Sequence, residues 1–70
     1  MTTVAANVTG TVAKINKQLG DAVTPGDSLM ILESMKMEVS VEAFVQGTVR
    51  EIRCREGQAV SEGDVLMVLE

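Results

Sequence analysis

Apolar and polar residues alternate along much of this chain with a period of two. The clearest run covers residues 37–46, where apolar residues stand at the odd-numbered positions, and a second run covers residues 3–9. Side chains two residues apart share one face of a strand, so each run predicts a strand with one buried face. A helix over residues 28–43 is the alternative, because Leu, Met, Glu and Lys are good helix formers. A helix would spread the alternating residues around its circumference, so the pattern predicts an all-β protein.

Turn residues mark the ends of the other predicted strands. Residues 11–15, 22–23 and 28–32 are apolar enough to form strands, and the Thr-Pro-Gly-Asp at residues 24–27 is typical of a turn. Residues 11–15 carry Val12 and Ile15 three positions apart, which favours a β-bulge or a change of the buried face there. Asp27 and Asp64 each follow a turn glycine, so the turns explain both acidic residues.

The two halves of the chain are copies of each other. Residues 3–33 align with residues 40–70 at a constant offset of 37 without a gap, and 16 of the 31 aligned positions are identical. The identical positions are mostly apolar residues and glycines, which set a core and its turns. We therefore expect one domain over residues 1–70 with about eight short strands, four per repeat. Each repeat should bury its apolar face against the other, as two sheets.

Only a short junction separates the repeats, and it reads Glu-Ser-Met-Lys-Met-Glu-Val from Glu33 to Val39. If the flanking segments are strands, the chain must reverse here, and a two-residue hairpin places Met35 and Lys36 at its tip. The favoured turns of this kind need positive φ at both central residues and usually contain Asn or Gly, so Met and Lys cost up to about 1–3 kcal/mol each. A local rule broken at the centre of a duplicated chain predicts a functional site.

Composition narrows the classes of function. The single cysteine, Cys54, excludes an intrachain disulfide, and a chain without histidine is not expected to hold a metal. The net charge is −4 and the six basic residues form no run, which argues against nucleic acid as a partner. No apolar segment approaches the roughly 20 residues that span a bilayer, and the first residues do not resemble a signal peptide. We expect a cytoplasmic protein that binds no membrane.

The chain also lacks the residues of an active site. It has no histidine, no tyrosine, no phosphate-binding glycine loop and no nucleophile beside a base. Glu33 and Glu38 flank the junction, but without other polar residues to position a substrate we interpret them as solvated strand ends. Cys54 is interpreted as an inert thiol. We expect no catalytic residue and no enzymatic activity in the chain itself.

The junction resembles the biotin-attachment motif of the biotin carboxyl carrier (biotinyl/lipoyl attachment) family, usually written Glu-Ala-Met-Lys-Met. Lys36 matches the lysine that is biotinylated, and Gly47, Val49, Gly57 and Gly63 fit the downstream Gly-x-Val and the two later glycines. The resemblance implies a flattened, pseudo-twofold β-barrel sandwich of two four-stranded antiparallel sheets. It also implies that the lysine lies on a hairpin and that the termini lie together at the far end.

The sequence departs from the family pattern in three places. Ser34 replaces the usual Ala, a small-for-small change that we expect to be tolerated. Asn7 and Phe44 stand where the family often has proline, and the sequence does not decide whether Phe44 is packed or exposed. The gapless repeat leaves no room for the thumb insertion of some bacterial acetyl-CoA carboxylase carriers, so the chain resembles the thumbless type.

The resemblance implies a free-standing biotin carboxyl carrier protein. A biotin protein ligase would join biotin to Lys36, and the biotin would carry carboxylate from a biotin carboxylase to a carboxyltransferase, in a carboxylase of the acetyl-CoA type. Met35 and Met37 would flank the site for recognition. Met35 suits contact with the ligase or with biotin, and Met37 should also belong to the core because it shares a face with Val39. We expect a monomer when the protein is isolated.

Two other functions stay open at this point. The first is a lipoyl carrier on the same fold, although such domains typically have an acidic residue before the lysine and a small one after it, where this chain has Met35 and Met37. The second is an unmodified interaction module, since barrel-sandwich domains also occur as structural parts of larger assemblies. Such a module would have no reason to keep Lys36 at a hairpin tip.

Overall fold

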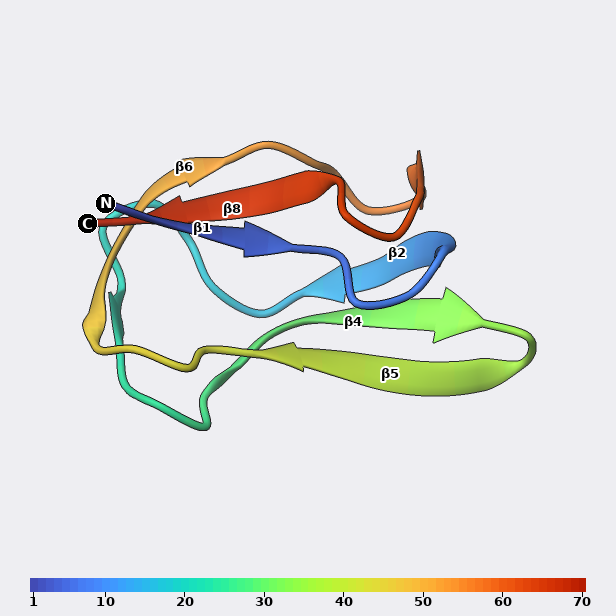
Figure 1. The fold of residues 1–70 in the computed structure, drawn as a ribbon, viewed down its shortest axis with the longest axis horizontal. Coiled ribbons are helices and arrows are strands. Elements are labelled where there is room, and N and C mark those ends of the chain that lie inside the picture. Colours follow the sequence, from blue (N-terminus) through green and yellow to red (C-terminus); the bar gives the residue numbers. More distant parts are fainter.

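The computed structural model describes residues 1–70 and consists of strands joined by turns (Figure 1). Eight strands follow one another along the chain: β1 (Thr2–Ala5), β2 (Gly10–Ile15), β3 (Ala22–Val23), β4 (Ser28–Ser34), β5 (Met37–Glu42), β6 (Gly47–Ile52), β7 (Ala59–Val60) and β8 (Val65–Leu69). The all-β prediction and the expected number of strands are confirmed. No helix of the length and apolarity that crossing a bilayer requires is present.

The strands form two four-stranded antiparallel sheets, with the orders β1-β8-β6-β3 and β5-β4-β2-β7. The offset of the repeats relates β2 to β6 and β3 to β7, so the second order is the first with the repeats exchanged. Each sheet takes two strands from each repeat. Our expectation that the repeats pack on each other as two sheets is therefore wrong in one respect: the sheets do not coincide with the repeats, because β1 pairs with β8 and β3 with β6.

The predicted bulge in the second strand is present and is itself duplicated. The register of β2 against β4 shifts between Val12 and Lys14, and the register of β6 against β8 shifts between Val49 and Glu51. These positions are equivalent in the two repeats. A bulge bends the strand and increases its twist, which helps two short sheets close over one core.

The core between the sheets contains only apolar side chains. Its largest fully buried members are leucines, methionines and valines, and no buried polar side chain interrupts it. The cluster consists of Val4, Ala6, Val12, Val23, Leu29, Met30, Leu32, Val41, Ala43, Val49, Val60, Leu66, Met67 and Leu69. All of them come from positions that are identical in the two repeats, as expected if the duplicated residues specify the fold.

The turns use the acidic residues that the sequence assigned to them. The carboxylate of Asp27 accepts a hydrogen bond from the Thr24 N–H at 2.9 Å, and that of Asp64 accepts one from the Ser61 N–H at 2.8 Å. This bond closes each turn on itself. Hydrogen bonding to the Thr24 N–H is also the main reason why the pKa of Asp27 lies below its ordinary value.

The molecule is elongated, with extents of 30 × 19 × 18 Å. Its two termini lie side by side at one end, because Thr2 in β1 pairs with Leu69 in β8. The hairpin between β4 and β5 projects from the opposite end (Figure 1). The arrangement implied by the family resemblance, with the junction and the termini at opposite ends, is confirmed.

Candidate functional site

The junction between the repeats forms a tight β-hairpin. Ser34 pairs with Met37, so the turn contains only Met35 and Lys36. Both turn residues have positive φ, 52° and 66°, and they are the only residues other than glycine that do. Positive φ at both central positions is the geometry of a type I′ turn, which follows the twist of the flanking strands. The predicted hairpin and its unusual turn residues are confirmed.

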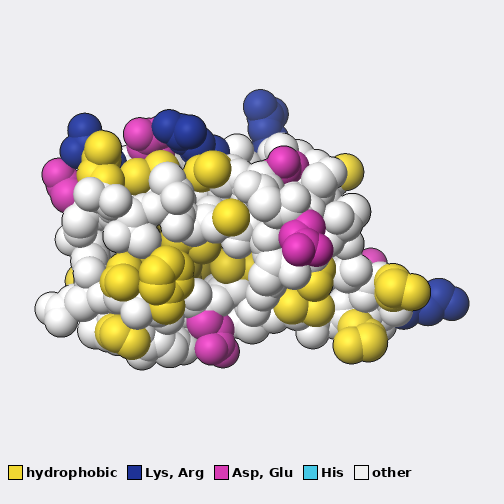
Figure 2. All heavy atoms as spheres, in the orientation of Figure 1, with side chains coloured by type: hydrophobic (Ala, Val, Ile, Leu, Met, Phe, Trp, Pro, Cys, Tyr) yellow, Lys and Arg dark blue, Asp and Glu magenta, His cyan; other side chains and the backbone are white.

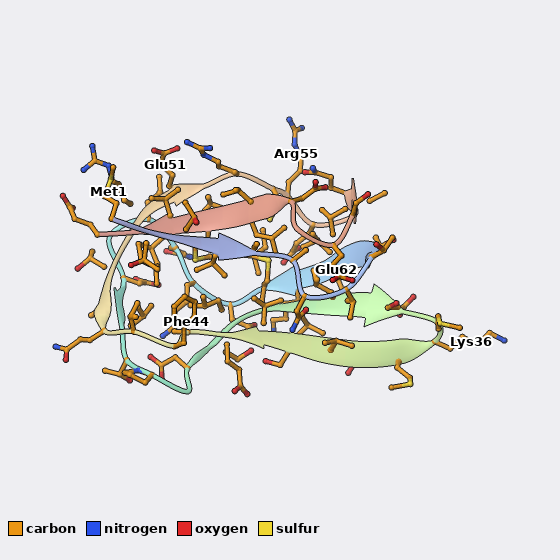
Figure 3. The ribbon with its side chains drawn as sticks, viewed as in Figure 1. Met1, Lys36, Phe44, Glu51, Arg55 and Glu62 are labelled. Carbon is orange, nitrogen blue, oxygen red and sulfur yellow. The ribbon has the colours of Figure 1, made fainter.

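The tip of this hairpin is surrounded by solvent. The side chain of Met35 is 92% exposed, and Lys36 is exposed as well. Lys36 takes part in none of the ion pairs or side-chain hydrogen bonds of the structure. Figure 3 shows its amine pointing away from the body, and Figure 2 shows hydrophobic and basic side chains together at the protruding end. The amine is thus open to a reagent or an enzyme from outside.

Met37 does not belong to the core, contrary to our expectation from the alternating pattern. It does lie two and four residues from Val39 and Val41, but burial falls steadily along this face: Val41 is buried, Val39 is half-buried and Met37 is 63% exposed. The hairpin extends beyond the body of the molecule (Figure 1), and the Met37 side chain is left exposed near its tip. Met35 and Met37 therefore give Lys36 two exposed apolar neighbours.

The other two lysines lie in different surroundings. Lys14 is in β2, a strand paired on both sides, and Lys17 forms an ion pair with Asp27 at 3.7 Å. Neither belongs to a projecting turn. The fold therefore distinguishes Lys36 from the other lysines by position.

The base of the hairpin is packed tightly against the loop between β1 and β2. A Cβ atom on Gly10 would overlap the carbonyl oxygen of Glu33, so only glycine fits there. The hydroxyl of Ser34 donates a hydrogen bond to the Thr9 carbonyl oxygen at 2.8 Å. This bond was missed from the sequence, where the Ser for Ala replacement signalled only a small side chain. The available signal was the hydroxyl group itself: serine can donate a hydrogen bond to a backbone carbonyl, and the alanine usual in the family cannot.

The remaining candidates do not add chemistry to the site. Glu33 and Glu38 face each other across the hairpin, both exposed and without a hydrogen-bonding partner, in keeping with solvated strand ends. Cys54 lies at the edge of the core, 3.7 Å from the Met30 sulfur, and burial raises the pKa of its thiol, which disfavours the reactive thiolate. Phe44 is 65% exposed.

Comparison with known proteins identifies the kind of domain that presents this hairpin. A family model described as "Biotin-requiring enzyme" matches residues 1–69. The chain belongs to this family. Pyruvate carboxylase of Bacillus subtilis (strain 168) is 50% identical to it over 40 residues, which are 57% of this chain and 4% of that enzyme. The resemblance noted at the junction is thus confirmed for the domain as a whole.

Solved structures extend the similarity to the fold of a biotin-requiring domain. Urea carboxylase of Kluyveromyces lactis superposes on 99% of this chain with a TM-score of 0.93 and 33% identity. A single-chain, multi-domain long-chain acyl-CoA carboxylase superposes on 94% of it, with a TM-score of 0.89 and 29% identity. The chain spans only 4–6% of the length of these three relatives. It is a biotin-carrier domain of the kind found in biotin-dependent carboxylases, and covalently attached biotin is its cofactor.

Proposed function

We propose that biotin is attached to Lys36 and that the domain carries carboxylate from a biotin carboxylase to a carboxyltransferase. The observation that carries this proposal is the exposed, unpaired amine of Lys36 on a two-residue turn at the far end of the molecule. Biotin, once attached, supplies a ring nitrogen that takes up and releases the carboxylate. The residues at the tip fit such a group, because no neighbouring side chain would have to move to admit it.

The chain itself contributes attachment, reach and a rigid mount. The Lys36 amine forms an amide with the biotin carboxyl group in the reaction of a biotin protein ligase, and the lysine side chain then serves as the tether. The paired strands β4 and β5 hold the turn away from the body, so that it can enter a partner's active site. Tethering replaces free diffusion with a high local concentration at both active sites.

Met35 and Met37 are proposed to form the surface by which the ligase recognises the lysine. Exposed methionines are costly in water, and both side chains here are flexible enough to adapt to an apolar groove. An exposed apolar pair on either side of one lysine distinguishes it from Lys14 and Lys17, which have no such neighbours in a turn.

The partners of the domain follow from the same proposal. They are a biotin protein ligase, a biotin carboxylase and a carboxyltransferase, and the acceptor that we propose is an acyl-CoA, with acetyl-CoA as the first candidate. One relative is named a long-chain acyl-CoA carboxylase, and the other two are named pyruvate carboxylase and urea carboxylase. We also propose that the domain works in the cytoplasm. Carboxylation assays with acetyl-CoA, pyruvate and urea, each added to the loaded domain and its partner subunits, would decide the acceptor.

Attachment is tested by co-expression with a biotin protein ligase, followed by intact mass measurement and avidin binding. We expect one biotin per chain on the wild type and none on Lys36→Arg, which keeps the charge but removes the primary amine. Lys14→Arg and Lys17→Arg are the matched controls and should be biotinylated like the wild type. Avidin binding that survives in Lys36→Arg would refute the assignment, and loading with lipoate instead of biotin would refute the cofactor.

A further inference from the structure

A short chain of hydrogen bonds connects the hairpin to the turn between β7 and β8. The Ser34 hydroxyl donates to the Thr9 carbonyl oxygen at 2.8 Å, and the Thr9 hydroxyl accepts from the Glu62 N–H at 3.0 Å. We call this pair of bonds the Ser34 latch. It joins three segments that are far apart in the sequence, and Figure 3 shows Glu62 over the loop that follows β1.

The loop to which Ser34 is fastened is itself held by main-chain hydrogen bonds. The Ala6 N–H donates to the Asp64 carbonyl at 2.8 Å, and the Gly63 N–H donates to the Ala6 carbonyl at 2.9 Å. Gly10 packs directly against the hairpin backbone on the same side. The latch therefore connects the base of the hairpin to a fixed part of the fold rather than to a free loop.

Comparison of the two repeats separates the latch from the common framework. The main-chain bonds around Ala6 have counterparts at the other end of the molecule, where the Gly26 N–H donates to the Ala43 carbonyl and the Ala43 N–H donates to the Asp27 carbonyl. Bonds that occur in both copies belong to the fold.

The bond of the latch between Thr9 and Glu62 has no such counterpart. The residue equivalent to Glu62 is Pro25, which has no N–H to donate, and the residue equivalent to Thr9 is Gln46, which makes no side-chain hydrogen bond. The fold therefore forms without this bond at the end where the termini lie, and has it at the end that carries Lys36.

We propose that Ser34 is a positioning residue, which fixes the orientation of the hairpin and so presents Lys36 to the enzymes that act on it. The proposal rests on the proposed function. A hairpin that samples several orientations is competent in only a fraction of them, and its apparent affinity for a partner falls by that fraction. The loss of the latch should therefore raise KM for the ligase and leave kcat unchanged.

The experiment compares Ser34→Ala with Ser28→Ala, the same change at the other end of β4. Ser28 also makes side-chain hydrogen bonds, to Ser40 at 2.8 Å and from the Asn16 amide at 3.1 Å. Both variants therefore lose one hydroxyl, and Ser28→Ala loses at least as many hydrogen bonds as Ser34→Ala. Initial rates of biotinylation by a biotin protein ligase give KM and kcat, and hydrogen exchange by NMR reports on the amides of residues 33–38. A second pair, Thr9→Val and Thr9→Ser, removes or keeps the hydroxyl that accepts from Glu62.

We expect Ser34→Ala and Thr9→Val to raise KM and to speed amide exchange at the hairpin by roughly three- to tenfold each, the factor that corresponds to one net hydrogen bond. Ser28→Ala and Thr9→Ser should match the wild type in both measurements. Wild-type KM and exchange in Ser34→Ala, or an equal change in Ser28→Ala, would overturn the positioning role. Failure of the proposed function would be seen separately, as a wild type that accepts no biotin at all.

Discussion

The domain should accept biotin only when its core is intact, even where the core is far from Lys36. Val23 is the appropriate position for a test, because it is 1% exposed and lies in β3, which pairs with Gly47 at the terminal end of the molecule. Its repeat equivalent, Val60, is less suitable, since it pairs with Gly10 close to the base of the hairpin. The perturbation that we choose is Val23→Asp.

The cost of Val23→Asp can be worked from its surroundings. Loss of a buried valine removes about 1.5–3 kcal/mol of apolar burial. The new carboxyl group meets a core without any polar side chain, and an unpartnered buried polar group costs a further 2–7 kcal/mol or so. At about 0.05–0.15 kcal/mol per residue, a chain of this length has a free energy of unfolding of roughly 3.5–10 kcal/mol. The substitution therefore removes most or all of the stability.

Circular dichroism with urea or heat would measure the unfolding, and avidin binding after incubation with a biotin protein ligase would measure acceptance of biotin. Val23→Asp should lose its cooperative transition and its biotinylation together. Ala22→Asp is the matched control, because Ala22 is exposed in the same strand, and it should keep both. An unfolded Val23→Asp chain that is biotinylated at the wild-type rate would show that the ligase recognises the linear sequence. That result would refute the claim that the domain accepts biotin only when it is folded.

Two further predictions concern the turns. Met35→Asn should raise the free energy of unfolding by about 1 kcal/mol and Tm by roughly 4–8 °C, because Asn tolerates positive φ better than Met; thermal melts that show no rise, or an equal rise in Met37→Asn, would contradict the strain. Because the hydrogen bond from the Thr24 N–H lowers the pKa of Asp27, the folded state gains stability above about pH 4 that it loses as the pH falls through the lowered value. The difference in urea midpoint between wild type and Asp27→Asn should therefore be constant near neutral pH and should shrink below about pH 4. A difference that persists to pH 2 would show that the charge on Asp27 does not contribute this stability.

The strands and the hairpin were predictable from the sequence because local rules and the duplication agree. Alternation identified β5, turn residues delimited β3 and β4, and the spacing of Val12 and Ile15 indicated the bulge in β2. The turn at Met35 and Lys36 followed from the requirement that two predicted strands be connected across few residues. Each of these inferences depends on residues that are near one another in the chain.

The features that were missed depend on contacts between distant segments. Alternation placed Met37 on the correct face of β5, but it could not show that the opposite sheet ends before that face does. The sequence also did not show that each sheet contains strands from both repeats. The duplication indicates which residues are apolar, but it does not indicate which strands pair with one another. The bond from Ser34 to Thr9 spans 25 residues, and no local pattern encodes it.

The pairing of β1 with β8 has a consequence for the time at which the domain can form. The first strand of the domain to leave the ribosome hydrogen-bonds to the last strand of the domain, and both sheets need strands from both repeats. The nascent first half, Lys36 included, thus lacks the partners that complete either sheet, although the junction has already been synthesised. A ligase that requires the folded hairpin meets its substrate only after β8 has emerged, so cofactor loading follows translation of the domain instead of accompanying it.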